Sequence, residues 1–249
     1  HYFRLSDLNY AKNITMLHSL LGFAISMLLV FRTNTAYDRW WEGRKLWGNL
    51  VNNSRNISIK LNAFLDHEDE KNRSFFRQLI PRFAFALKAH LHSEVTRLEL
   101  DDQPHPEIPN FDHSKHVPNQ VAGLILSRVN LLYRDKKISG EQMIILNDEL
   151  RSFLDICGAC ERIKNTPIPY SYSSFIKKFI FFYIITLPVG MVVSLGWLTI
   201  PVVAFIFYVL ASLEIIAEEI EDPFGKDSND LPMERLAETI SKNCVDILS

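Results

Sequence analysis

An uncharged run from Phe179 to Leu213 constrains the fold of this chain more than any other feature of its sequence. As one straight helix the run would measure about 50 Å at 1.5 Å per residue, whereas the hydrocarbon core of a bilayer is only about 30 Å thick. Proline and glycine residues divide the run, which predicts a turn at Ser194–Thr199. With Tyr172–Ile176 and Glu214–Ile220 extending its ends, each arm approaches the roughly 20 residues that a membrane span requires.

The average composition hides this membrane character. The 249 residues are 47% hydrophobic and 22% charged, with a net charge of −2, which would suit a soluble domain. However, Ile14–Phe31 and Phe179–Leu213 carry no charge, whereas Arg32–Lys178 is rich in charged residues. The chain therefore divides into a membrane part and a water-facing part. The near-neutral balance offers no basic face of the kind that nucleic acid requires, which excludes nucleic acid as a partner.

Basic residues predict the topology, because they collect on the cytoplasmic side of a membrane. Arg32 follows the first span and Lys177 precedes the second, whereas the connection between the paired spans has no Lys or Arg. Three spans then leave the N-terminus outside, so we expect a fourth span upstream of His1. The predicted organisation is an outer segment and first span (1–31), a cytoplasmic helical domain (32–178), paired transmembrane helices (179–213) and a cytoplasmic acidic segment and helix (214–249).

The water-facing part has the periodicity of helices. Apolar residues recur at helical spacing from Leu46 to Leu61, and the same period returns in Phe75–His92 and Glu141–Ile163. Strand-like alternation is absent, so the sequence predicts an all-α membrane protein with a large helical cytoplasmic domain. Between the helices, Glu99–Gln120 is rich in proline and polar residues and predicts a loop.

No sequence motif supports an enzyme. Nucleotide-binding, nucleophile-elbow and zinc-protease motifs are missing from the sequence. The loop histidines His105, His113 and His116 have no recognised metal-ligand spacing, so we interpret them as part of a solvated loop. Cys157 and Cys160 form a CxxC with no second ligand pair, which favours buried thiols over a zinc site.

Three blocks of sequence resemble the bestrophin family: Phe31–Leu50, Cys160–Tyr170 and Ile216–Pro232. The resemblance spans nearly the whole chain. It implies a homopentamer in a lipid bilayer, with four spans per subunit around one central pore and passive flow of monovalent ions. It requires no cofactor. The absence of a long C-terminal extension favours a multi-pass protein of a bacterial inner membrane.

The first span carries a candidate pore neck. Phe23, Met27 and Phe31 recur every four residues and share one helix face. The resemblance places these residues in the narrow apolar neck, where a hydrophobic ring gates by dewetting. The alternative is that this face packs against neighbouring helices. A different register, in which Thr15 and Ser19 belong to the pore-lining face, is also open.

Glu141 is the candidate residue of a second, cytoplasmic aperture that the resemblance implies. A ring of glutamates would favour cations. A surface position at a helix N-terminus, stabilised by the helix dipole, is the alternative. Selectivity is therefore undecided between cations and chloride.

The acidic segment after the last span is a candidate calcium site, since hard cations prefer oxygen ligands. The resemblance places Asp227 and Asp230 at the two side-chain ligand positions of a calcium clasp, and Asp222 and Lys226 complete the candidate set. Lys226, however, stands where the clasp has an acidic neighbour. The alternative is that the two aspartates form turns and helix caps.

Two further interpretations concern the first span and its end. Arg32, Arg39, Trp40 and Trp41 follow the span, where such residues anchor a helix at the interface, and a direct pore role is the alternative. His18 within the span predicts a hydrogen-bonded, interior-facing side chain. Polar residues in this span favour a channel over the competing function, a membrane-anchored helical scaffold that binds a partner.

Overall fold

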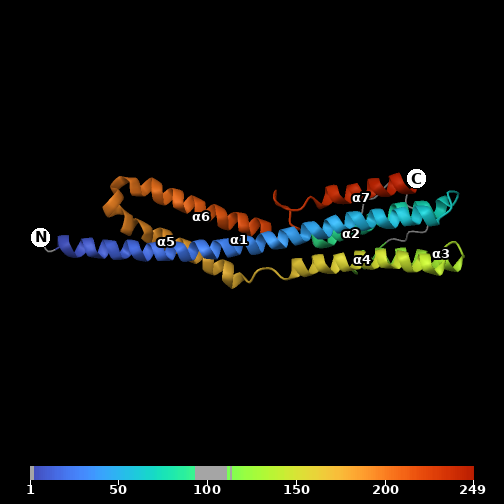
Figure 1. Ribbon diagram of the computed structural model, residues 1–249, viewed down its shortest axis with the longest axis horizontal. Coiled ribbons are helices and arrows are strands. Elements are labelled where there is room, and N and C mark those ends of the chain that lie inside the picture. The colour runs from blue at the N-terminus through green and yellow to red at the C-terminus, as the bar shows by residue number, and fades with distance from the viewer. Residues whose placement is uncertain (1–2, 93–110, 113) are drawn as a thin grey trace. The chain divides into compact units, whose positions relative to one another are not determined.

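The computed structural model describes residues 3–92, 111–112 and 114–249, and every regular element in these ranges is a helix (Figure 1). The prediction of an all-α fold is therefore confirmed. The elements are α1 (Phe3–Phe64), α2 (Glu70–Leu91), α3 (Val117–Arg134), α4 (Gly140–Asn165), α5 (Tyr170–Leu195), the short 3-10 helix η1 (Gly196–Leu198), α6 (Thr199–Glu221) and α7 (Met233–Leu248).

The helices pack into two compact units. We name them after the predicted topology: the membrane unit comprises His1–Trp40 and Pro167–Pro223, and the cytoplasmic unit comprises Trp41–Thr166 and Phe224–Ser249. Helix α1 contributes to both, because its 62 residues are about three times the number that a membrane span needs. The units reflect packing, whereas the predicted boundaries at residues 31, 178 and 213 concern the bilayer and stay a prediction.

The membrane unit contains helices that are long and apolar enough to cross a bilayer. They are the first part of α1, α5, and η1 with α6. Helices α5 and α6 pack against each other as a hairpin (Figure 1), and the chain reverses at Gly196, whose φ of 53° suits glycine. The predicted turn at Ser194–Thr199 is thus confirmed. Ile25 of α1, Ile180 of α5 and Leu210 of α6 meet in the core of this unit.

The cytoplasmic unit has a separate aromatic and aliphatic core. Helix α2 packs against α3, α4 and α7. The rings of Phe83 on α2 and Phe153 on α4 lie 5.1 Å apart between centroids, and both side chains are fully buried. Leu50 and Leu61 of α1 are also fully buried, as their helical spacing predicts.

We expect truncation of Phe153 to destabilise this unit. The Phe153→Ala substitution should lower the free energy of unfolding by about 3–5 kcal/mol, because it removes a buried ring and leaves a cavity. The neighbouring Leu154 is 44% exposed, so Leu154→Ala should change stability by less than about 0.5 kcal/mol. Denaturant unfolding of the detergent-solubilised protein, followed by circular dichroism, measures both. Equal losses would contradict the assignment of Phe153 to the core.

Candidate functional site

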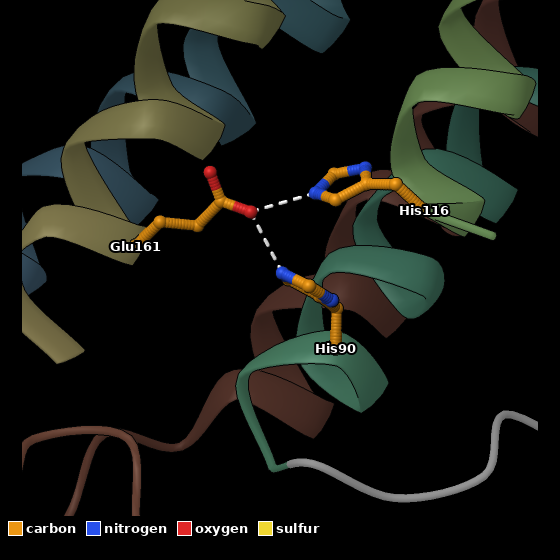
Figure 2. A group of neighbouring side chains, drawn as sticks. All are labelled: His90, His116 and Glu161. Carbon is orange, nitrogen blue, oxygen red and sulfur yellow. Dashed lines mark hydrogen bonds and ion pairs between the residues drawn. The ribbon is translucent and has the colours of Figure 1, made fainter. Parts of the chain in front are cut away.

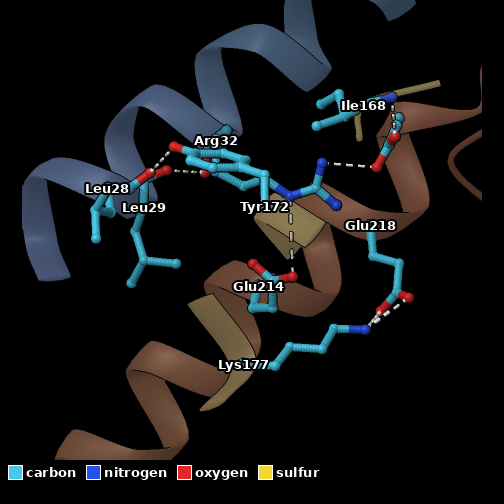
Figure 3. A network of polar contacts seen from close by, with 10 residues as sticks. Leu28, Leu29, Arg32, Ile168, Tyr172, Lys177, Glu214 and Glu218 are labelled. Carbon is cyan, nitrogen blue, oxygen red and sulfur yellow. Dashed lines mark hydrogen bonds and ion pairs between the residues drawn. The ribbon is translucent and has the colours of Figure 1, made fainter. Parts of the chain in front are cut away.

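A buried arginine lies at the centre of a polar network in the membrane unit (Figure 3). The Arg32 side chain on α1 is 1% exposed. Its Nη1 atom lies 2.7 Å from Oε2 of Glu221, and its Nε atom lies 3.9 Å from Oε1 of Glu214. Both carboxylates come from α6, about two helical turns apart. The network therefore joins α1 to α6 by charge.

Glu221 extends this network to the segment that precedes α5. Its Oε1 atom accepts a hydrogen bond of 2.8 Å from the backbone N–H of Ile168, and its backbone carbonyl accepts one of 2.9 Å from Nε of Arg39. One glutamate thus contacts two arginines of α1 and the chain before α5. Near it, the more exposed Lys177 of α5 and Glu218 of α6 form an ion pair of 2.8 Å.

These positions correct one interpretation of the residues that follow the first span. Arg32 does not face headgroups, because its guanidinium is enclosed by protein and paired with carboxylates. Arg39 does bind a carbonyl oxygen, as an interfacial arginine can. Trp40 stacks on Tyr37 with centroids 6.2 Å apart, and Trp41 is 46% exposed. The sequence gives no signal for the partners of Arg32, since they lie far along the chain.

The candidate neck residues form an exposed apolar face of α1. Phe23, Met27 and Phe31 are 69%, 44% and 57% exposed, whereas Ile25 and Leu29 on the other side of the helix pack into the core. Within the described chain, this face is therefore turned away from α5 and α6. The alternative frame includes Thr15, whose hydroxyl donates to the Gly190 carbonyl of α5 at 3.3 Å. The role of this face as a neck stays a prediction.

The polar side chains of the first span find hydrogen-bond partners within α1 or on α5. His18 is 8% exposed, with Nδ1 2.9 Å from the Ile14 carbonyl and Nε2 3.0 Å from the Thr186 hydroxyl, which confirms the expected interior position. Ser19 and Ser26 are exposed, and their hydroxyls donate to carbonyl oxygens one turn back. Such bonds satisfy a serine in lipid as well as in water. The serines therefore do not separate a channel from an anchored scaffold.

Glu141 lies in the first turn of α4 and is exposed. Ser139 and Gln142 form a capping box at this end, and the Ser139 hydroxyl donates to Oε2 of Glu141 at 2.7 Å. This hydrogen bond lowers the pKa of Glu141, so the side chain is charged at neutral pH. The geometry matches the helix N-terminus alternative, and its place in an aperture stays a prediction.

The candidate calcium residues lie in the turn between α6 and α7. The backbone N–H of Asp227 donates to Oδ2 of Asp230 at 2.5 Å, and the N–H of Asp230 donates to the Asp227 carbonyl at 3.1 Å. This reciprocal pair is what a turn-forming role requires. Asp222 and Lys226 are exposed in the same turn. Calcium binding at these residues stays a prediction.

A second cluster lies in the cytoplasmic unit and joins His90, His116 and Glu161 (Figure 2). Of the three loop histidines considered from sequence, His105 and His113 lie outside the described residues, and His116 caps α3. Sequence reasoning missed the cluster, because its members are far apart and form no local motif. Cys157 and Cys160 are free and buried as predicted. Burial and the charge of Glu161 raise the pKa of Cys157 to about 12.

Comparisons with known proteins give a consistent result. The model of a family described as bacterial and fungal bestrophin proteins matches residues 5–246. A voltage-dependent anion channel-forming protein of Nostoc sp. is 37% identical, with 98% of this chain and 83% of the relative covered. The voltage-dependent anion channel-forming protein YneE of Escherichia coli K12 is 32% identical, with 89% and 73% covered. A crystal structure of a bestrophin homologue from Klebsiella pneumoniae has a TM-score of 0.84 at 29% identity, with 94% of this chain and 87% of that chain covered.

We expect loss of the Arg32 charge to destabilise the membrane unit. The Arg32→Met substitution leaves two carboxylates without their buried counter-charge, which should cost about 3–5 kcal/mol of unfolding free energy. The control is Lys177→Met, which breaks an ion pair whose side chains are 47% and 57% exposed and should cost at most about 1 kcal/mol. Denaturant unfolding in detergent compares them.

A second variant separates charge from packing. Adding Glu214→Gln to Arg32→Met should restore part of the lost stability, because one uncompensated buried charge is removed. If the double variant is no more stable than Arg32→Met alone, the electrostatic account of Glu214 is wrong.

Proposed function

This chain belongs to the bacterial and fungal bestrophin family, and on that premise we propose that it assembles as a homopentameric channel for small monovalent ions in a bacterial inner membrane. The observation that carries the proposal is the exposed apolar face of α1 that contains Phe23, Met27 and Phe31, opposite the face whose Ile25 and Leu29 are buried in the core. Fivefold assembly with this face toward the axis would stack apolar rings in a single pore. Ions would pass when the rings widen enough to be wetted.

We propose chloride as the preferred ion. The names of the Nostoc and Escherichia coli relatives, which describe anion channel-forming proteins, support this choice. A ring of Glu141 side chains in a cytoplasmic aperture would oppose anion flow, since a ring of fixed negative charges favours cations. Glu141 then moderates selectivity rather than setting it.

Ion flux from proteoliposomes tests the proposal. Vesicles that contain the purified protein should release Cl⁻ faster than Na⁺, and empty vesicles should release neither ion. Preferred release of Na⁺ would support the channel function but would contradict the proposed preference for chloride. If no ion is released by protein whose pentameric mass has been confirmed, the alternative of a membrane-anchored scaffold is favoured.

Widening of the neck should raise the current. The Met27→Ala and Phe31→Ala substitutions remove apolar bulk from the proposed rings, so single-channel conductance or open probability should increase, because dewetting becomes less favourable. The matched control is Phe205→Ala on α6, which removes an aromatic ring that is 66% exposed but lies outside the proposed neck. Planar-bilayer recordings compare the three variants. Unchanged currents in both neck variants would remove these residues from the pore.

Neutralising Glu141 should shift selectivity toward anions. In asymmetric salt, the reversal potential of Glu141→Gln should move toward the chloride equilibrium potential, since a fixed negative charge has been removed from the proposed aperture. Asp155→Asn is the control, because Asp155 is another exposed carboxylate of α4. An equal shift in both variants would indicate a general surface-charge effect and not an aperture at Glu141.

A further inference from the structure

The side chains of His90, His116 and Glu161 converge on one point of the cytoplasmic unit (Figure 2). The Nε2 atoms of His90 and His116 lie 2.7 Å and 2.6 Å from the same carboxylate oxygen, Oε1 of Glu161. One potential ligand atom from each residue lies within 4.8 Å of the others. His90 comes from the last turns of α2, His116 caps α3, and Glu161 comes from the last turns of α4.

We propose that His90, His116 and Glu161 bind a zinc ion. Two imidazole nitrogens with one carboxylate form a ligand set that Zn²⁺ uses in proteins, with water in the fourth position. Calcium and magnesium prefer sets made wholly of oxygen atoms, so this site discriminates against them. The three side chains are between 29% and 36% exposed, which leaves room for a water ligand and a route for the ion.

The distances require only a small adjustment of the side chains. Zinc lies about 2.0–2.2 Å from nitrogen and oxygen ligands, so two ligands in tetrahedral geometry are about 3.3 Å apart. The present separations of 2.6 and 2.7 Å are those of hydrogen bonds. The nitrogens and the carboxylate must therefore move apart by about 0.6–0.7 Å. Rotation of partly exposed side chains provides this movement without a change in the helices.

The proton on His116 must also move. Its Nδ1 atom accepts a hydrogen bond of 3.2 Å from the backbone N–H of Asn119, so the proton of the neutral ring is on Nε2 and points at Glu161. A zinc ion binds through a lone pair on Nε2. The proton must therefore leave Nε2, and the neutral ring then carries it on Nδ1. A protonated Nδ1 no longer accepts the Asn119 N–H, so zinc binding breaks this cap hydrogen bond at the start of α3, where Asn119 is exposed to water. Acid weakens binding, because protons compete for the imidazole nitrogens.

The groups around the cluster define the ligand set further. Cys157 lies one turn before Glu161 on α4, but its thiol is buried and stays protonated because its pKa is raised to about 12 by burial and by Glu161. Its sulfur is also not among the ligand atoms that converge at the cluster, so Cys157 is not part of the proposed ligand set. The ammonium of Lys164 donates to the His90 backbone carbonyl at 3.1 Å, so this cation is directed at the backbone of α2. Burial raises the pKa of Glu161, but the hydrogen bonds from His116 and His90 outweigh it and lower the pKa, which keeps the carboxylate charged for the metal.

Zinc titration of the full chain tests the site. The protein is purified without a histidine tag, stripped with a chelator and titrated with ZnCl₂ against a zinc-binding dye, with separate titrations of CaCl₂ and MgCl₂. We expect one zinc per protomer, a higher unfolding temperature with zinc, and no competition from the other two cations. This readout does not depend on ion conduction, so its failure is distinct from failure of the channel proposal.

Three variants decide whether the bound zinc is at this cluster. His116→Asn removes a ligand but keeps a residue that caps helices well, and Glu161→Gln keeps the size of the side chain. Each should weaken zinc binding by at least about 10-fold, the loss that follows when even an outer partner of a metal ligand is removed. His67→Gln, at an exposed histidine outside the cluster, should bind as the wild type does. Absence of binding by the wild type, or equal affinity in all variants, would overturn the proposal.

Discussion

The buried charge of Arg32 is the constraint on which the membrane unit depends. Arg32 lies near the middle of α1, where its apolar part ends, and a buried guanidinium there needs paired charges because its desolvation costs several kcal/mol. Glu221 and Glu214 of α6 provide those charges, and Glu221 also binds the N–H of Ile168. The rotation of α6 is thereby fixed, since both carboxylates must face α1. The depth of the hairpin along α1 is fixed by the same contacts.

This pairing gives α1 two different faces. The face that contains Ile25, Leu29 and Arg32 is buried against α5 and α6, so the opposite face is left with large apolar side chains exposed. A single protomer in water would not keep such a face uncovered, but lipid or neighbouring protomers can cover it. Charge pairing on one side of the helix thus leaves Phe23, Met27 and Phe31, the proposed neck residues, on an exposed face.

In the cytoplasmic unit, polar side chains cap the helices and connect their ends. Ser139 begins α4 and His116 begins α3 by accepting backbone N–H groups. His116 uses its second nitrogen to reach Glu161, which His90 also contacts. The start of α3 is therefore tied to the ends of α2 and α4. The same three residues therefore form a hydrogen-bonded clasp, and they are the residues that we propose as zinc ligands.

Local features of the sequence determined the helices. Hydropathy and charge located the spans, Gly196 and its neighbours located the turn, and the spacing of Leu50, Ile57 and Leu61 identified a buried helix face. The resemblance carried by three blocks supplied the family. These signals can be read along the chain because hydropathy, periodicity and turn chemistry depend on neighbouring residues.

Only the tertiary structure decided which distant side chains meet. Arg32 read as an interfacial anchor, and its partners at Glu214 and Glu221 became evident only when α6 was folded against α1. His116 read as one of several loop histidines, yet it meets His90 and Glu161. A side chain shows its charge and its hydrogen-bonding atoms in the sequence, but not its partner. The partner is chosen by the packing of helices, which is set by contacts between residues far apart in the chain.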